Sequence, residues 1–412
     1  MESPPPQKLN DPIHAFMARV LADPAALARL AVPVATNDYV PLAMQIARDY
    51  GIALDEADLA ALVQPDMLGL GRFAPAPVTL DRWPGEGWVP VRSAPGGAAP
   101  AFDWAWFGDA TYSGSFFEES VRYATELPFN RMFRTRTSLE ALVADAAHHA
   151  VTPPSGFVFH MSRCGSTLAA RMLMAVPGHL VASEPEPLDA VVHWATVSGA
   201  PREDRIAALR AIVAALGRRS GAGQRRFFVK LHAWHTLALP LFRAAFPDVP
   251  WLFLYRDPVE VLMSQVTQPG VYMTPGSPPP GVADGDLSAA TSPAGHAARV
   301  LALMCGAVID HWGLGGGLAV DYRDLRSAMT GDVPAHFGFR PDASELEKMA
   351  AAAGADAKRP SAPFVPDAQD KRSLASGEIL AAARNLNALL ATLDKLGRDG
   401  ISDVNDRDSA AR

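Results

Sequence analysis

Five short apolar runs alternate with longer stretches of helical spacing in the C-terminal part of the chain. The runs lie at residues 157–159, 180–182, 227–231, 251–255 and 318–320. Apolar residues recur at helical spacing near residues 166–176, 203–217, 236–246, 258–267 and 294–312. This alternation predicts an α/β fold of three layers, a mostly parallel sheet with helices on both faces, whose ligands bind at the carboxyl ends of the strands.

Residues 1–66 predict a small helical N-terminal region. One helical face carries Ile13, Phe16, Met17, Val20 and Leu21. Two further helices are expected at residues 41–50 and 55–63, with Gly51 at the stop of the first and Asp55 as the N-cap of the second. The region weakly resembles the small helical Nif11-type leader domain but carries no chemically specific motif, so a docking or packing role is favoured.

Residues 67–150 divide into a linker and an aromatic-rich accessory segment. Pro, Gly and Ala dominate residues 65–100, which is typical of a linker or a long irregular loop. Seven aromatic residues follow within sixteen positions: Phe102, Trp104, Trp106, Phe107, Tyr112, Phe116 and Phe117. With Arg131, Arg134 and Arg136 they are consistent either with an acceptor-binding surface or with a packed subdomain whose arginines are solvated. The packed subdomain is the favoured interpretation.

A Pro-rich stretch at residues 269–293 interrupts the α/β pattern. It is too rich in proline for regular structure and long for a simple connection, so it is either a lid over the site or a disordered excursion. We assign residues 151–395 to the α/β domain and residues 396–412 to a polar C-terminal tail.

Composition narrows the classes of function. The 412 residues are 49% hydrophobic and carry a net charge of −7, which gives no general attraction to nucleic acid. The N-terminus lacks the features of a signal peptide and no apolar run reaches membrane-spanning length, so we expect a cytoplasmic protein. Two cysteines cannot build a disulfide framework, and the histidines show no metal-ligand spacing, so no metal is expected.

The segment at residues 162–167 joins an apolar strand to a helix and is the main candidate for ligand binding. Arg163, Gly165, Ser166 and Thr167 supply a cation, a flexible position and two hydroxyls at the positive end of a helix dipole, which suits a phosphate or sulfate group. The lysine of an ordinary Walker loop is missing, since Gly165 is followed directly by Ser166. Cys164 lies where a helix N-terminus lowers a thiol pKa, although a small residue that fits the loop is the favoured interpretation.

A second stretch, residues 251–264, places an arginine at the end of another buried strand. Arg256 leaves that strand just before a helix, and Ser264 lies about two turns into the helix, so both can converge on one anion. The alternative is a surface pair of Arg256 and Asp257 with a solvent-facing serine.

Together the two stretches resemble the PAPS-dependent sulfotransferase family, over roughly residues 155–395. Residues 161–167 resemble its 5′-phosphosulfate loop, and residues 255–264 resemble its 3′-phosphate motif, including the eight-residue step from arginine to serine. The resemblance implies a P-loop-type domain with PAPS as co-substrate. The loop residues named above, with Cys164 among them, would hold the 5′ end, and Arg256 and Ser264 would hold the 3′-phosphate.

Some features of the family are replaced or missing. Leu168 stands where the cytosolic group has an aromatic residue that stacks on adenine, and the C-terminal Arg-Lys-Gly signature is not present. Lys371 and Arg372 are candidates for a substitute clamp, with a solvated charge pair as the alternative. Residues 320–325 also resemble a late strand-to-turn element of many sulfotransferases.

Two segments offer a base for the acceptor. Glu184 follows a predicted strand in a segment that resembles bacterial and Golgi-type sulfotransferases, and Lys230 with His232 resembles the lysine–histidine segment of the cytosolic group. Glu184 is favoured because Pro185 biases it toward an extended conformation, but His232 stays open. Lys230 would stabilise the leaving group unless it is an edge-strand residue, and His160 and His235 are expected to be structural.

The function expected from these residues is transfer of a sulfuryl group from PAPS to a hydroxyl or amine of a small-molecule, carbohydrate or peptide acceptor. A P-loop kinase or nucleotide hydrolase is one alternative. A non-catalytic nucleotide- or peptide-binding protein is another.

Overall fold

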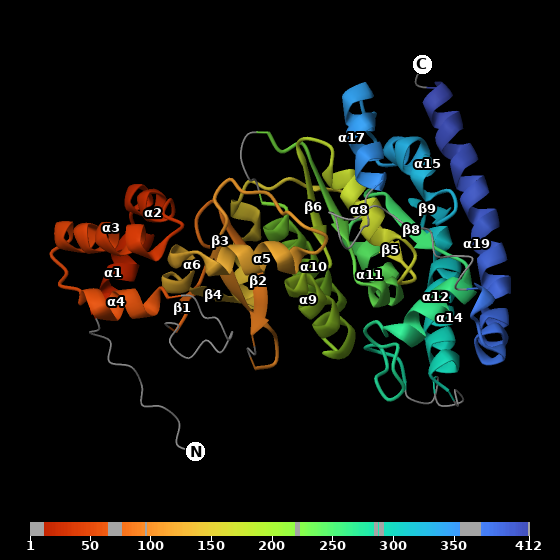
Figure 1. Ribbon diagram of the computed structural model, residues 1–412, viewed down its shortest axis with the longest axis horizontal. Helices are drawn as coiled ribbons and strands as arrows, with labels where there is room; N and C mark the ends of the chain where they lie inside the picture. Colours follow the sequence, from red (N-terminus) through yellow and green to blue (C-terminus); the bar gives the residue numbers. More distant parts are fainter. Residues whose placement is uncertain are drawn as a thin grey trace.

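The computed structural model describes residues 12–64, 76–94, 97–218, 223–283, 287, 292–354 and 372–410. A helical unit, a small sheet and a larger sheet with its helices follow one another along the long axis of the molecule (Figure 1). Part of the Pro-rich stretch and Lys371 lie outside the described residues.

The N-terminal unit consists of short helices whose starts are set by side-chain caps. They are α1 (Pro12–Leu21), α2 (Pro24–Leu30), α3 (Thr36–Asp49) and α4 (Glu56–Leu62). Asp55 accepts a hydrogen bond from the Asp58 N–H at 2.9 Å, so the predicted N-cap is confirmed. The start predicted at Pro41 was wrong: α3 begins at Thr36 and carries Pro41 inside the helix, although proline usually marks a first turn.

The accessory region contains a four-stranded sheet with the order β1-β4-β3-β2. Its elements are β1 (Val78–Leu80), β2 (Trp88–Ala94), β3 (Ala101–Trp106), α5 (Phe117–Glu126), α6 (Pro128–Met132), β4 (Thr135–Ser138) and α7 (Leu139–Asp145). The expectation of a linker across residues 65–100 was therefore wrong for the stretch that forms β1 and β2. Strand β2 lies there because Trp88, Val89 and Val91 are buried.

Most of the clustered aromatic side chains form the core of this region. Phe102, Trp104 and Phe117 are buried, and the Arg136 guanidinium pairs with Asp103. The region also holds the N-terminal unit, because Tyr39 Oη donates to Met132 Sδ at 3.3 Å in the core. These contacts agree with a packed subdomain.

The larger sheet has the strand order β6-β7-β5-β8-β9, and every pairing is parallel. Its strands are β5 (Pro154–His160), β6 (His179–Ser183), β7 (Arg226–Lys230), β8 (Trp251–Tyr255) and β9 (Gly317–Asp321). Each contains or overlaps one of the five predicted apolar runs. These strands are buried on both faces, and apolar runs of this kind are typical of parallel sheets.

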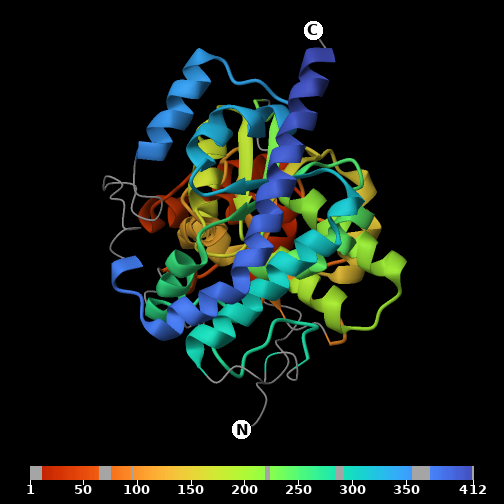
Figure 2. The ribbon, with the colours of Figure 1, turned by 90° about the vertical axis from the view of Figure 1, so that its right-hand side faces the viewer.

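Helices cover both faces of this sheet, which confirms the three-layer α/β fold. They are α8 (Ser166–Met174), α9 (Glu186–Val197), α10 (Arg202–Leu216), α11 (Leu239–Ala245), α12 (Pro258–Thr267), α14 (Pro293–Asp310), α15 (Leu325–Thr330), α16 (Asp332–His336), α17 (Ala343–Gly354) and α19 (Gly377–Ala410). Figure 2 shows α19 passing across the β9 side of the sheet, and Figure 1 shows it at that end of the molecule. The helix continues past residue 395, where the sequence predicted a tail.

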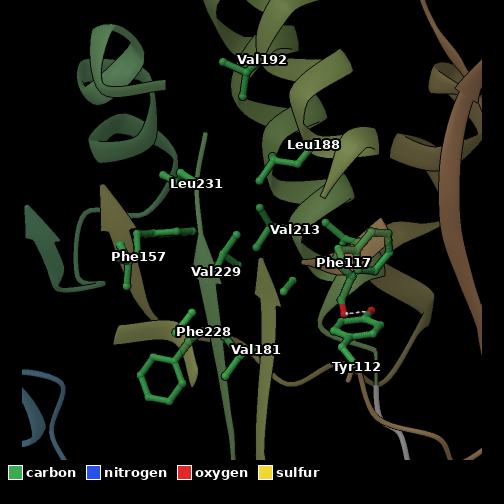
Figure 3. Packing of buried hydrophobic residues seen from close by; sticks show 14 of the residues in the cluster. Tyr112, Phe117, Phe157, Val181, Leu188, Val192, Val213, Phe228, Val229 and Leu231 are labelled. Carbon is green, nitrogen blue, oxygen red and sulfur yellow. Dashed lines mark hydrogen bonds between the residues drawn. The ribbon is translucent and has the colours of Figure 1, made fainter. Parts of the chain in front are cut away.

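The core joins the accessory region to the α/β domain. Figure 3 shows Val181 and Val229 of the sheet beside Leu188 of α9 and Val213 of α10. Tyr112 Oη, from the accessory region, donates a buried hydrogen bond to the Leu216 carbonyl at 2.7 Å. Burial of each large apolar side chain contributes about 1.5–3 kcal/mol, so this shared core stabilises both parts. None of the described helices is long and apolar enough to cross a membrane.

Histidine 179 makes a pH-dependent contribution to stability. His179 Nδ1 lies 3.0 Å from the Leu173 carbonyl oxygen, and its ring packs 5.0 Å from the rings of Phe228 and Phe339. Burial lowers the pKa of His179 to about 4. The folded protein therefore takes up this proton less readily than the unfolded chain, whose histidine pKa is about 6.5.

The stability that His179 contributes is complete above about pH 6.5 and is lost as the pH falls toward 4. We expect His179→Asn, which keeps a donor near Leu173 but does not titrate, to flatten the pH dependence of the unfolding free energy by about 2–3 kcal/mol between pH 7 and pH 4.5. Urea unfolding of both proteins at several pH values measures this. Equal pH dependence in the two proteins would contradict it.

Candidate functional site

The loop between β5 and α8 has the backbone conformation of a tight anion-binding turn. Ser162, Arg163 and Gly165 have φ angles of 68°, 52° and 88°, all in the left-handed region. Successive residues in such turns form concave nests of N–H groups, and the first N–H groups of α8 have no partner inside the helix. The structure thus has a tight turn before α8 at residues 162–165, where the sequence predicts the loop.

Gly165 occupies a position that needs both a positive φ angle and space beside the Tyr322 ring. Its φ angle favours glycine, and a Cβ placed on it would lie 2.6 Å from Cδ2 of Tyr322. The backbone therefore approaches the Tyr322 ring from the end of β9. Ser166 and Thr167 follow as the first residues of α8, and both are buried.

Arg163 and Ser162 are tied to the segment that follows α12. Arg163 Nη2 donates to the Gln268 carbonyl at 2.7 Å. Gln265 Nε2 donates to Ser162 Oγ at 3.0 Å, and Gln265 Oε1 accepts from the Gly270 N–H at 2.8 Å. The end of α12 and Gln268 thus contact the loop, and Gly270, at the described beginning of the Pro-rich stretch, is joined to them through Gln265.

Cys164 faces the interior of the protein. Its side chain is buried, and its thiol donates to the Leu254 carbonyl of β8 at 3.1 Å. Burial raises the pKa of the Cys164 thiol to about 12, so the helix N-terminus does not produce a reactive thiolate. Cys164 is a packing residue, and any role in ligand binding falls to its backbone. Leu168, at the position of the family's adenine-stacking residue, is likewise buried.

Arg256 lies beside the loop at the end of β8. Its guanidinium carbon is 4.2 Å from the centre of the Tyr322 ring, the same ring that Gly165 approaches. Arg256 Nε also donates to Glu260 Oε2 at 2.7 Å, and its Nη2 contacts the same oxygen. The arginine is therefore buried and paired within its own helix turn, not with Asp257 as the alternative supposed.

Ser264 and Arg372 both contact Glu260, but only Arg372 approaches the carboxylate that Arg256 contacts. Ser264 Oγ donates to the Glu260 carbonyl at 2.9 Å, so it approaches the backbone of this residue. Arg372 Nη2 lies 2.8 Å from Asp257 Oδ2, and Arg372 Nε lies 3.6 Å from Glu260 Oε1. The structure thus brings Arg372 next to the Arg256 pair.

Glu184 and Lys230 form a charge pair on the other side of the loop. Glu184 has a left-handed φ of 53°, its N–H donates to the Lys230 carbonyl at 2.7 Å, and its carboxylate contacts Lys230 Nζ. Strand β7 lies between β6 and β5, so Lys230 is not an edge-strand residue. Phe116 of the accessory region covers the Lys230 ammonium at 4.9 Å from the ring centre.

Two histidines flank the Glu184 carboxylate. His160 Nε2 lies 3.6 Å from Glu184 Oε1, and His232 Nδ1 lies 3.6 Å from Oε2. Burial alone would raise the pKa of Glu184, but the Lys230 ammonium and the His160 ring outweigh it and lower that pKa. Glu184 is therefore a weak base at neutral pH, whereas His232 is partly exposed beside it.

His160 has a structural role, as expected. Its Nε2 lies 2.9 Å from the Leu231 carbonyl oxygen, and its Nδ1 accepts from the Ser162 N–H at 3.1 Å. These contacts fix the neutral tautomer that is protonated on Nε2. Burial lowers the pKa of His160 and keeps this ring uncharged.

Asp189 belongs to this cluster, and the sequence analysis missed it. Asp189 Oδ1 accepts from Trp234 Nε1 at 2.8 Å, pairs with His235 Nε2 at 3.0 Å, and lies 3.9 Å from His232 Nε2. Its pKa is lowered to about 2, because the hydrogen bond from His235 and the neighbouring rings outweigh the cost of burial. The acidic residues that follow β6 were the one sign in the sequence that could have pointed to Asp189, but the helix that carries it was not predicted.

The strand order fixes the order of these groups along one edge of the sheet. Glu184 follows β6, Lys230 ends β7, the loop follows β5, Arg256 follows β8 and Tyr322 follows β9. Glu184 and Lys230 therefore lie on one side of the loop at residues 162–167, and Arg256 lies on the other. Within the described residues, no group of three or more His, Cys, Asp and Glu side chains is arranged to hold a metal ion.

Comparison with known proteins gives similarity of structure only. No protein-family model matches the chain, and no curated protein matches its sequence. The chain is similar to the sulfotransferase domain of the Synechococcus PCC 7002 olefin synthase, with 15% identity, a TM-score of 0.36, and coverage of 58% of this chain and 96% of that one. It is also similar to sulfotransferase STF1 from Mycobacterium tuberculosis H37Rv, with 15% identity, a TM-score of 0.33, and coverage of 53% and 80%.

The environment of Cys164 predicts that neither thiol reacts in the folded protein. Cys164 and Cys305 are both buried, and burial raises the pKa of each to about 12. We expect a thiol reagent at pH 8 to modify the folded protein at least about 100-fold more slowly than the protein in guanidinium chloride. The absorbance of the chromophore that the reagent releases measures both rates. A thiol of the folded protein that reacts as fast as in the denatured protein would contradict the burial of both cysteines.

Proposed function

We propose that this protein is a sulfotransferase that moves a sulfuryl group from PAPS to a hydroxyl or amine of an acceptor. One observation carries the proposal, namely the order of groups along the sheet edge. Three groups follow one another in space: Arg256, the loop at residues 162–167, and the cluster of Glu184, Lys230 and His232. Their order matches the order of the 3′-phosphate and the phosphosulfate of PAPS and of the acceptor beyond them. The resemblance of residues 161–167 and 255–264 to the family motifs supports the same assignment.

The loop side chains and N–H groups would hold the 5′-phosphosulfate. Arg163, Ser166 and Thr167 add donors to the backbone nest, and a planar guanidinium contacts two anionic oxygens at once. Arg163 would have to leave the Gln268 carbonyl to reach the ligand. Ligand binding at the loop is therefore linked to the segment after α12.

Arg256 would hold the 3′-phosphate, with Ser264 as a neutral donor and Arg372 as a second cation. Glu260 already neutralises part of the Arg256 charge, so the phosphate would share the guanidinium with this carboxylate. Arg372, beside Asp257 and Glu260, compensates for that negative charge. Lys371 stays a candidate from the sequence alone.

His232 is the better base for the acceptor. PAPS supplies a sulfuryl group whose bond to the 5′-phosphate is broken while a new bond forms between sulfur and the acceptor oxygen or nitrogen. His232 takes the acceptor proton, and Lys230 offers its ammonium to the negative charge that develops on the departing phosphate. Glu184, which is held ionised by Lys230, orients that ammonium and the imidazole.

Arg256 is the residue whose removal should affect recognition of the 3′-phosphate. Arg256→Ala should weaken binding of PAP by about 2–4 kcal/mol, because the substitution removes one partner of a charged hydrogen-bonded contact. Binding of AMP, which lacks the 3′-phosphate, should change much less. Calorimetry with the two nucleotides measures the difference, with Arg48→Ala, at an exposed arginine of α3, as the control.

Equal losses for PAP and AMP would remove the 3′-phosphate assignment. Arg256 is buried, so Arg256→Lys provides a variant that keeps the charge if the alanine variant does not fold. Binding of Mg-ATP in preference to PAP by the unmodified protein would favour a kinase or nucleotide hydrolase.

His232 is the residue whose removal should affect the chemical step. His232→Ala should lower kcat by about 10²–10⁴-fold while PAP affinity stays within about twofold, because general base catalysis contributes at this level. Transfer of labelled sulfate, first screened over carbohydrate, lipid, small-molecule and peptide acceptors, gives the rates. His193→Ala, an exposed histidine on α9, is the matched control. A kcat unchanged by His232→Ala would exclude His232 as the base.

A further inference from the structure

Asp189 anchors the segment that carries His232. Its Oδ1 accepts the Trp234 Nε1–H at 2.8 Å and contacts His235 Nε2 at 3.0 Å, and both partner side chains are almost fully buried. The His235 N–H in turn donates to the His232 carbonyl at 3.0 Å. One carboxylate on the first turns of α9 thus fixes the turn that begins at His232.

The two ring nitrogens of His232 face different carboxylates. Nδ1 lies 3.6 Å from Glu184 Oε2, and Nε2 lies 3.9 Å from Asp189 Oδ1. Both distances exceed hydrogen-bond length, so neither contact by itself decides which nitrogen carries the proton. The difference between the two carboxylates lies in their charge partners.

The negative charge of Glu184 is compensated by an ammonium group, whereas among the residues that the structure describes the negative charge of Asp189 is not. The Glu184 carboxylate contacts the Lys230 ammonium, which compensates its charge. Within the described part of the chain, the ion-pair contacts of Asp189 are histidines, and His235 is kept neutral because burial lowers its pKa. The field at His232 is therefore more negative on the Asp189 side.

We propose that Asp189 is the positioning residue of His232. It directs the Nε2–H of the imidazole toward its own carboxylate, leaves Nδ1 as the nitrogen that accepts a proton beside Lys230, and stabilises the imidazolium that results. This assignment rests on the proposed function for its catalytic meaning, but the pairing itself is a property of the free protein. Glu184, the more obvious carboxylate in the sequence, orients Lys230 instead.

The charges around His232 come from several elements. Glu184 directly follows β6, and Asp189 lies in the first turn of α9. Lys230 ends β7, His160 ends β5 and His235 belongs to the turn after His232. Tyr272, from the segment after α12, packs against Trp234 with ring centres 5.9 Å apart, and the Asp189 charge helps to raise the pKa of Tyr272. Of the two carboxylates beside His232, Glu184 has an ammonium partner in Lys230, and the ion-pair contacts of Asp189 among these described residues are with histidines.

The test is the tautomer of His232 in the free protein. Long-range ¹H–¹⁵N correlation spectra of histidine-labelled protein distinguish a protonated from an unprotonated ring nitrogen, and His232→Gln assigns the signals. We expect the Nε2–H form in the unmodified protein and a shift toward the Nδ1–H form in Asp189→Asn. Asn can still accept from Trp234 and His235, so the fold should persist.

Kinetics give a second readout. Asp189→Asn should lower kcat at least about tenfold, while the KM for PAPS stays within about twofold. It should also move the acid limb of the pH profile of kcat about one unit toward lower pH, because the lost negative charge makes protonation of His232 harder. Asp204→Asn, an exposed carboxylate on α10, should change neither quantity.

An Nδ1–H tautomer in the unmodified protein would overturn the proposal, whether or not the variant folds. A tautomer and a pH profile that Asp189→Asn leaves unchanged would also overturn it, and would leave Asp189 as a purely structural anchor. If the unmodified protein transfers no sulfate to any acceptor, the proposed function fails while the spectra still decide the pairing.

Discussion

The contact between Lys230 and Glu184 is the interaction on which the rest of the site depends. A buried ammonium without a counter-charge would be strongly destabilising, and Glu184 supplies that charge from the neighbouring strand end. The pairing requires β6 and β7 to be adjacent and parallel, so that both side chains emerge at one edge. It also explains the left-handed backbone of Glu184, because the residue must turn back toward Lys230 directly after the strand.

A second constraint is the close approach between the loop at residues 162–167 and Tyr322. Gly165 lets the loop pass the Tyr322 ring, and the same ring lies under the Arg256 guanidinium. One aromatic side chain therefore sets the spacing between the loop and the arginine. The strand ends alone would leave this spacing undefined, since both groups lie on loops.

Much of the α/β domain could be predicted from the sequence, because its strands are buried on both faces and stand out as apolar runs. Strand β8 was predicted at residues 251–255, where the structure has it. The accessory sheet was not predicted, because β1 and β2 lie in a stretch rich in Pro and Gly, and β1 has only three residues. Short strands of this kind form through their partners, and a pattern along the chain does not record those partners.

The site could be predicted in part for a similar reason. Arg163 and Arg256 follow apolar strands and were found from that position. Asp189 could not be found in the same way, because its importance comes from Trp234 and His235, more than forty residues away. The sequence also left open whether Glu184 or His232 is the candidate base. Their ranking depends on Lys230, which keeps Glu184 ionised through a contact that the sequence could not show.

Phe116 has a consequence for how the chain can be divided. The boundary near residue 151 separates the accessory region from the α/β domain in sequence, but Phe116 covers Lys230 and Tyr112 bonds to Leu216 across it. A fragment that starts at residue 151 would open the Lys230 ammonium to water and leave the Leu216 carbonyl without this donor. The accessory region is therefore one wall of the candidate site, and Lys230 owes part of its burial to a residue outside the α/β domain.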